Sequence, residues 1–165
     1  MEIKVIDNFI KDETLFEILQ NHFAHEMPHY YVGHSKNKSE GLFYKSDLDP
    51  MDVLSQYILS LAHKIVKKNF KVIRMYLNIH HKEMPGSWHL DDGDGTNVTC
   101  LLMVQGSGSF EIRRETIVDF VPNRFIVFDA SKEHRGNAPL KSGPPRITLA
   151  VKTEVLSELK DEHYI

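Results

Sequence analysis

The fold class is indicated most clearly by residues 98–128, which read VTCLLMVQGSGSFEIRRETIVDFVPNRFIVF. Short runs rich in β-branched and aromatic residues alternate here with polar turns such as Gly106-Ser107-Gly108 and Pro122-Asn123. Closely spaced short strands between such turns are typical of a sandwich or a barrel. The segment therefore predicts strands over residues 98–104, 109–113, 116–121 and 124–128.

Helical spacing of the apolar residues dominates the chain before Lys71. Asp12 is placed to cap a helix over residues 13–24, and the pair Asp49-Pro50 typically begins one, here over residues 50–69. The other expected elements are strands over residues 1–7, 72–79 and 146–152, and irregular structure or a short hairpin over residues 26–47.

The length of 165 residues fits a single domain. We expect a helical N-terminal support over residues 1–70, a β core over residues 71–155 and a short tail over residues 156–165. The formal net charge of -3 gives no sign of a strongly basic surface, so a nucleic-acid partner is not expected. No segment has the apolar length of a membrane helix or the core of a signal peptide, so we expect no membrane partner and a cytoplasmic location.

A metal site in this chain would have to use histidine and carboxylate, because ten histidines stand beside one cysteine. His89-Leu90-Asp91 would present an imidazole and a carboxylate on one face of a strand. With His134, which follows a later strand, they make the two-histidine, one-carboxylate set that holds Fe(II) and leaves three positions open. The alternative is that Asp91 simply begins the aspartate-rich turn that follows it.

The three open positions suit a 2-oxo acid, which takes two of them, and dioxygen, which takes the third. Arg146, which opens the last strand, can form a forked ion pair with the far carboxylate of such an acid. Thr148 shares its strand face and can add a hydroxyl donor. The alternatives are a solvated strand-end arginine at position 146, or Arg135 in its place, although Arg135 directly follows His134 and should face the other way.

These motifs, in this order, resemble the Fe(II)/2-oxoglutarate-dependent dioxygenases, and within them the prolyl-4-hydroxylase-like branch. The resemblance covers almost the whole chain. It rests on an opening strand at residues 3–10, a first core strand at residues 74–78, the HxD motif at residues 89–91, a turn and strand at residues 108–112, the strand toward the distal histidine at residues 121–129, and an RxS/T motif at residues 146–148. Trp88, before the HxD motif, departs from the family pattern.

The resemblance implies a mainly β fold with flanking N-terminal helices, the double-stranded β-helix or jelly roll. It implies Fe(II), 2-oxoglutarate as cosubstrate and dioxygen, with ascorbate as a further cofactor, and His89, Asp91 and His134 as metal ligands. By position in the family, Tyr76 and Asn78 would contact 2-oxoglutarate beside Arg146 and Thr148. The implied reaction hydroxylates a C–H bond while 2-oxoglutarate is converted to succinate and carbon dioxide.

The substrate follows less directly from the residues. A prolyl residue in a peptide or protein is the first expectation, and a free amino acid or another side chain is the alternative. A second class of function also stays open, a non-catalytic jelly-roll protein that binds metal. The segments at residues 28–45 and 81–88 are expected to select the substrate, and His80 is a further residue that could reach the pocket.

Overall fold

The computed structural model describes residues 2–34, 42–93 and 95–157. The elements are β1 (Lys4–Ile6), α1 (Glu13–Asn21), the π-helical turn η1 (His22–Glu26), β2 (Tyr30–His34), β3 (Leu42–Asp47), α2 (Val53–Val66), β4 (Asn69–His80), β5 (Val98–Gln105), β6 (Ser109–Ile112), β7 (Thr116–Asp119), β8 (Phe125–Asp129), β9 (His134–Asn137) and β10 (Arg146–Ser157). Strands predominate and the helices lie in the first part of the chain, which confirms the expected fold class.

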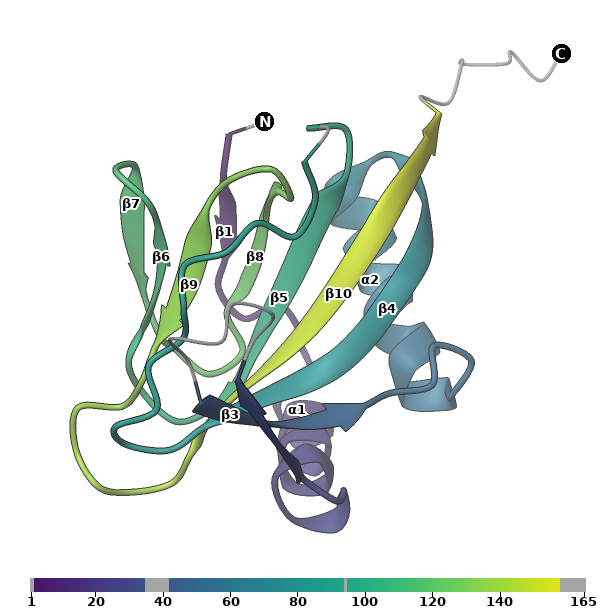
Figure 1. Ribbon diagram of the computed structural model, residues 1–165. Helices are drawn as coiled ribbons and strands as arrows, with labels where there is room; N and C mark the ends of the chain where they lie inside the picture. Colours follow the sequence, from purple (N-terminus) through teal and green to yellow (C-terminus); the bar gives the residue numbers. More distant parts are fainter. Residues whose placement is uncertain (1, 35–41, 94, 158–165) are drawn as a thin grey trace, which may run out of the picture.

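The strands form two antiparallel sheets that face each other (Figure 1). The larger sheet has the strand order β1-β8-β5-β10-β4-β3-β2, and the smaller has the order β7-β6-β9. Neighbours such as β10 and β4, or β8 and β5, lie far apart in the sequence, as in a jelly roll. The sandwich that results is the expected double-stranded β-helix.

Two hydrophobic cores lie on opposite faces of the larger sheet. One is shared with the helices and includes Leu19, Phe23 and Ile58, while the other, including Phe110 and Phe128, lies between the two sheets. Because both faces are covered there, β5 and β8 are buried along almost their whole length, and β5 reads as a nearly continuous apolar run rather than an alternating one. This explains why the run at residues 98–104 could be recognised from sequence.

The helix starts show one success and one error of local prediction. Asp12 caps α1 as expected, because its side chain accepts a hydrogen bond from the backbone N–H of Leu15. The second helix begins later than expected, since its cap is Asp52, whose carboxylate accepts from the N–H groups of Leu54 and Ser55. Asp49 instead accepts from the N–H of Met51 in the preceding turn, so the pair Asp49-Pro50 does not begin the helix.

The segment before α2 forms the β2–β3 hairpin, one of the two expected forms. Residues 35–41 of the predicted substrate-selecting segment lie outside the described residues, as do residues 158–165 of the predicted tail. β10 runs on to Ser157, past the expected end of the last strand. None of the described helices combines the length and the apolar character that a membrane span requires.

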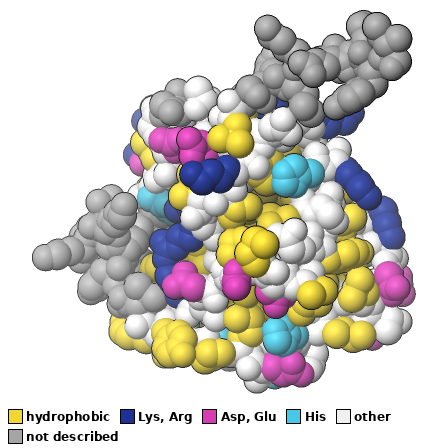
Figure 2. Space-filling model, turned by 90° about the vertical axis from the view of Figure 1, so that its right-hand side faces the viewer, with side chains coloured by type: hydrophobic (Ala, Val, Ile, Leu, Met, Phe, Trp, Pro, Cys, Tyr) yellow, Lys and Arg dark blue, Asp and Glu magenta, His cyan; other side chains and the backbone are white. Residues whose placement is uncertain are grey.

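The face turned to the viewer in Figure 2 mixes apolar, basic, acidic and histidine side chains. Lysine and arginine are scattered among aspartate and glutamate there and do not gather into one basic area. A continuous basic stripe is the usual electrostatic footprint of a nucleic-acid-binding protein. The described part of this face does not show one.

Candidate active site

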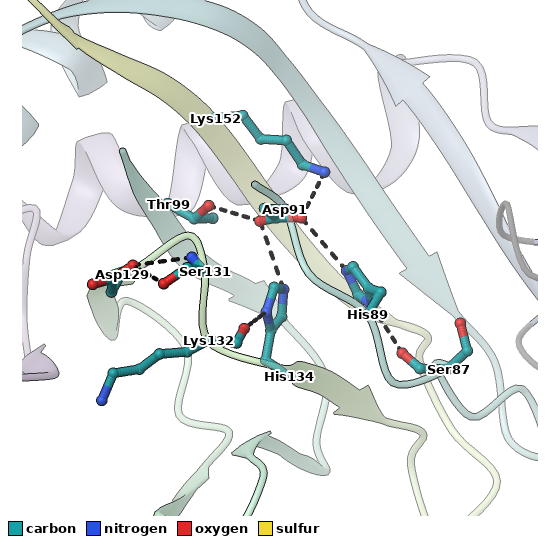
Figure 3. A network of polar contacts seen from close by, with 9 residues as sticks. All are labelled: Ser87, His89, Asp91, Thr99, Asp129, Ser131, Lys132, His134 and Lys152. Carbon is teal, nitrogen blue, oxygen red and sulfur yellow. Dashed lines mark hydrogen bonds and ion pairs between the residues drawn. The ribbon is translucent and has the colours of Figure 1, made fainter. Parts of the chain in front are cut away.

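The three predicted metal ligands come together at the mouth of the sandwich (Figure 3). His134 is the first residue of β9, and its backbone exchanges two hydrogen bonds with that of His89, at 3.0 and 2.9 Å. His89 belongs to no strand, because among the described residues it pairs only through this isolated bridge. The expectation that a strand would align His89 with Asp91 is therefore wrong. Backbone hydrogen bonds from His89 to His134 and from Asp91 to Ala130 place the two side chains instead.

The donor atoms of the three side chains surround one point in space. Nε2 of His89 lies 3.6 Å from Oδ1 of Asp91, and Nε2 of His134 lies 3.6 Å from Oδ2. One donor atom from each of the three residues can be chosen so that all lie within 4.8 Å of one another. Asp91 and His134 are buried, while the His89 side chain is 41% exposed and leaves one side of the cluster open.

Hydrogen bonds to the backbone fix which ring nitrogen faces the cluster. Nδ1 of His89 lies 2.8 Å from the carbonyl oxygen of Ser87, and Nδ1 of His134 lies 2.8 Å from that of Lys132. A carbonyl only accepts, so each Nδ1 carries the proton and each Nε2 keeps its lone pair for a metal. Burial lowers the pKa of His134 to about 4, so the ring is neutral and ready to bind metal at neutral pH.

The Asp91 carboxylate is held from two neighbouring strands. The Thr99 hydroxyl of β5 donates to Oδ2 at 2.7 Å, and Nζ of Lys152 in β10 lies 2.6 Å from Oδ1. Thr99 and Lys152 are opposite each other in the β5–β10 register, which explains why they reach the same carboxylate. Burial alone would raise the pKa of Asp91, but His134, Lys152 and Thr99 outweigh it and lower that pKa, so the ligand is ionised.

A cavity of about 700 Å³ opens beside this cluster, over one face of the paired strands β4 and β10, and is lined on another side by His134 and Gly136 of β9. Its lining includes all four residues expected to contact the cosubstrate, namely Tyr76, Asn78, Arg146 and Thr148. The register explains this, because Arg146 lies opposite His80 and Thr148 opposite Asn78 in the β10–β4 pair, with their side chains on one face. His80 also lines the cavity.

Arg146 is a buried cation without a counter-ion. It is 3% exposed, and no carboxylate in the described part of the chain forms an ion pair with it. Its Nε and the nearby Thr148 hydroxyl are buried without a hydrogen-bond partner. Burial lowers the pKa of the guanidinium to about 10, which still leaves it charged at neutral pH. Such groups are costly unless an anion pairs with them, so the site is built for an anionic ligand.

Arg135, the alternative to Arg146, and the nearby Arg113 do not line the cavity. Arg135 forms an ion pair with Glu111 at 2.9 Å and packs on the Trp88 ring, as expected of a residue facing away from the cavity. Arg113 pairs with Glu133 at 2.7 Å on the surface. Both guanidinium groups lie near the Trp88 ring, at 4.4 Å for Arg135 and 5.6 Å for Arg113, and Trp88 also lines the cavity.

Two participating residues were not singled out from the sequence. Lys152 looks like an ordinary lysine near the end of a strand, and only the β5–β10 register places it on Asp91. Gly136 lies where the Arg146 guanidinium crosses β9, and a Cβ there would fall 2.3 Å from Nη1 of Arg146. Neither residue has a local sequence signal, because each role depends on a partner in a distant strand.

Comparison with known proteins yields structural neighbours only, since no protein-family model and no curated protein matches the sequence. The viral collagen prolyl hydroxylase of Paramecium bursaria Chlorella virus-1, in its 2-oxoglutarate complex, has a TM-score of 0.69 at 13% identity, covering 94% of this chain and 97% of that one. A prolyl-4-hydroxylase of Pseudomonas putida has a TM-score of 0.62 at 14% identity, covering 94% and 93%. The chain has the fold of the 2-oxoglutarate oxygenases.

This oxygenase fold is shared with proteins of different substrates. HygX of Streptomyces hygroscopicus, solved with nickel, 2-oxoglutarate and hygromycin B bound, has a TM-score of 0.66 at 11% identity and covers 93% of this chain and 83% of its own. Identities this low establish the fold and leave activity to be argued from the site.

The residues present fit the two groups that the oxygenase fold implies. Two imidazole nitrogens and an ionised carboxylate suit Fe(II), and a metal would share Oδ1 of Asp91 with the Lys152 ammonium, which lies 2.6 Å away. The unpaired Nε of Arg146 and the unpaired Thr148 hydroxyl suit the far carboxylate of a 2-oxo acid. His89, Asp91 and His134 would hold the metal, and the cosubstrate would extend from there toward Arg146.

Replacing Gly136 with alanine should weaken 2-oxoglutarate binding by about tenfold and leave metal binding unchanged, since the added Cβ would displace the Arg146 guanidinium. Titration of the Mn(II)-loaded protein with 2-oxoglutarate under nitrogen measures this. Gly143→Ala is the matched control, because a Cβ at Gly143 meets nothing within 4 Å. Equal affinities in the two variants would show that Arg146 does not need its present position.

Proposed function

We propose that this protein is an Fe(II)- and 2-oxoglutarate-dependent dioxygenase that hydroxylates a C–H bond. The observation that carries the proposal is the buried Arg146, which has no counter-ion among the described residues and an unpaired Nε, beside the unpaired Thr148 hydroxyl in the cavity that also holds the His89, Asp91 and His134 donors. A protein that only bound metal would have no use for a buried guanidinium in the same cavity as the metal ligands. The arrangement instead suits a bidentate 2-oxo acid with a second carboxylate.

In the proposed reaction, dioxygen, 2-oxoglutarate and R–H give R–OH, succinate and carbon dioxide. The bound Fe(II) would supply the activation of dioxygen and the oxidising power. The chain's own residues bind and orient. Arg146 and Thr148 hold the far carboxylate, and Tyr76 and Asn78 form the wall beside it. Burial of this wall keeps water away from the cosubstrate, and the open side at His89 leaves room for substrate.

A prolyl residue in a peptide is the substrate class that we propose to test first. Three observations favour this class. Several structural neighbours are prolyl hydroxylases, and one of these was solved with a peptide fragment of hypoxia inducible factor. The metal cluster is open on one side, and the sequence motifs resemble those of the prolyl-4-hydroxylase-like branch. A small-molecule substrate is the alternative, which the hygromycin B complex of the neighbour HygX favours. Ascorbate dependence and a cytoplasmic location remain expectations.

The test is metal-dependent binding and turnover of 2-oxoglutarate. The Mn(II)-loaded protein under nitrogen should bind 2-oxoglutarate, and the Fe(II)-loaded protein in air should release succinate, slowly alone and faster with its substrate. Proline-containing peptides, free amino acids and aminoglycosides are the three panels to compare. The proposal fails if 2-oxoglutarate does not bind in the presence of metal, whatever the panel shows.

A further inference from the structure

The ion pair between Lys152 and Asp91 gives the metal cluster a neighbouring cation (Figure 3). Nζ of Lys152 lies 2.6 Å from Oδ1 of Asp91, and the two side chains are only 25% and 3% exposed. Little water therefore screens the charge. The ammonium lies on the cavity side of β10, because Lys152 lines the cavity together with Arg146 and Thr148 of the same strand.

Lys152 has no other carboxylate to pair with among the described residues. Opposite it on β4 lies Arg74, and both cations lie near the ring of Tyr76, at 5.7 Å for Lys152 and 4.6 Å for Arg74. Lys45 approaches the same ring at 5.8 Å. Arg74 and Lys45 share a different carboxylate, that of Asp47, at 3.5 and 2.6 Å. A metal that binds Asp91 must therefore share it with Lys152.

We propose that Lys152 is a positioning residue that acts through Asp91, weakening divalent metal binding while strengthening the binding of the dianionic cosubstrate to the metal-loaded site. A divalent ion, the Asp91 carboxylate and the Lys152 ammonium carry two net positive charges, against one without the ammonium. Like charges at this range repel in a poorly screened site, and the same surplus attracts an anion. The inference rests on the proposed function, because it takes 2-oxoglutarate as the anion.

The opposite signs of the two effects distinguish this role from a structural one. Loss of a purely structural contact would loosen Asp91 and weaken the binding of both the divalent metal and 2-oxoglutarate. Loss of a positive charge that repels the metal ion and attracts 2-oxoglutarate must instead raise the affinity for metal and lower the affinity for 2-oxoglutarate. The Thr99 hydroxyl donates to Oδ2 at 2.7 Å without involving Lys152, so a Lys152 variant is expected to keep one of the two anchors of the carboxylate.

The experiment compares Lys152→Met with Lys152→Arg, using Mn(II) alone and then 2-oxoglutarate on the Mn(II)-loaded protein under nitrogen, both by calorimetry. In Lys152→Met we expect Mn(II) to bind about tenfold tighter and 2-oxoglutarate about tenfold weaker. Lys152→Arg keeps the charge and should stay near the wild-type values. Lys71→Met is the matched control, because Lys71 of β4 is exposed and pairs across the sheet with Glu154 of β10, 3.7 Å away.

Several results would overturn the inference. They are weaker binding of both Mn(II) and 2-oxoglutarate in Lys152→Met, unchanged affinity for either of them, or a Lys152→Arg variant whose affinities match those of Lys152→Met. Lys152→Gln, polar but uncharged, carries the same two expectations and takes the place of the methionine variant if that protein does not fold by circular dichroism. Failure of the wild-type protein itself to bind 2-oxoglutarate would instead refute the proposed function.

Discussion

Replacing His134 with alanine is expected to lower the affinity for divalent metal by at least about 100-fold and to abolish succinate formation. The variant loses the Nε2 donor that lies 3.6 Å from Asp91 Oδ2, and the two remaining ligands cannot hold the metal on one face. The change also removes a buried ring that packs at 4.7 Å on Phe128 and 5.6 Å on Phe110. Some loss of stability therefore accompanies the loss of metal.

A second variant separates ligation from packing. His134→Gln fills much of the same space but lacks an imidazole nitrogen, so it should keep more of the stability and still lose metal. His22→Ala is the matched control, because His22 is a half-exposed histidine far from the cluster in sequence, paired with Glu26 at 2.7 Å. Mn(II) calorimetry and urea unfolding measure the two quantities. Retention of wild-type Mn(II) affinity in both His134 variants would refute the assignment of this ligand.

Replacing Arg146 with methionine is expected to have opposite effects on stability and on cosubstrate binding. The free protein should gain about 1–4 kcal/mol in its free energy of unfolding, because a buried cation without a counter-ion gives way to an apolar side chain of similar length. Binding of 2-oxoglutarate should fall by about 100-fold or more, since its far carboxylate loses a forked, charge-assisted partner. Metal binding should change little.

Urea unfolding without ligand and thermal unfolding with Mn(II) and 2-oxoglutarate measure these effects. The wild-type protein should be stabilised by 2-oxoglutarate in the second measurement, and Arg146→Met should not be, because only a ligand that binds the folded state raises its stability. Arg113→Met is the matched control, since Arg113 is exposed and paired with Glu133. An Arg146 variant that is less stable than wild type, yet still stabilised by 2-oxoglutarate, would place the cosubstrate elsewhere.

The sequence predicted most of the strands because their signal is local. The run at residues 98–104 is apolar except for Thr99, and the structure buries β5 on both faces. β9 was missed, because its residues His134–Asn137 read as polar and glycine-containing, and only pairing with β6 makes them a strand. The late start of α2 does not follow from the sequence pattern, because Asp49 and Asp52 are both competent caps; in the structure Asp52 caps the helix and Asp49 accepts from the N–H of Met51 in the preceding turn.

The residues of the candidate site could be predicted from the sequence because their side-chain chemistry is distinctive. His89, Asp91 and His134 could be proposed as ligands because their residue types are those of a non-thiolate metal site, and their order along the chain matches a known pattern. Arg146 and Thr148 could be placed on one face because residues two apart on a strand share a face. These inferences need only residue identity and short-range periodicity.

What only the tertiary structure decided is which of these groups have partners. That Arg146 has no counter-ion, that Gly136 makes room for it, and that Lys152 shares Asp91 all depend on contacts between distant strands. Such contacts follow from the register of β10 against β4 and β5, which is set by the packing of both cores. Sequence periodicity determines which face a side chain occupies, whereas the energy of a charge depends on what lies across that face, and this is a property of the folded chain alone.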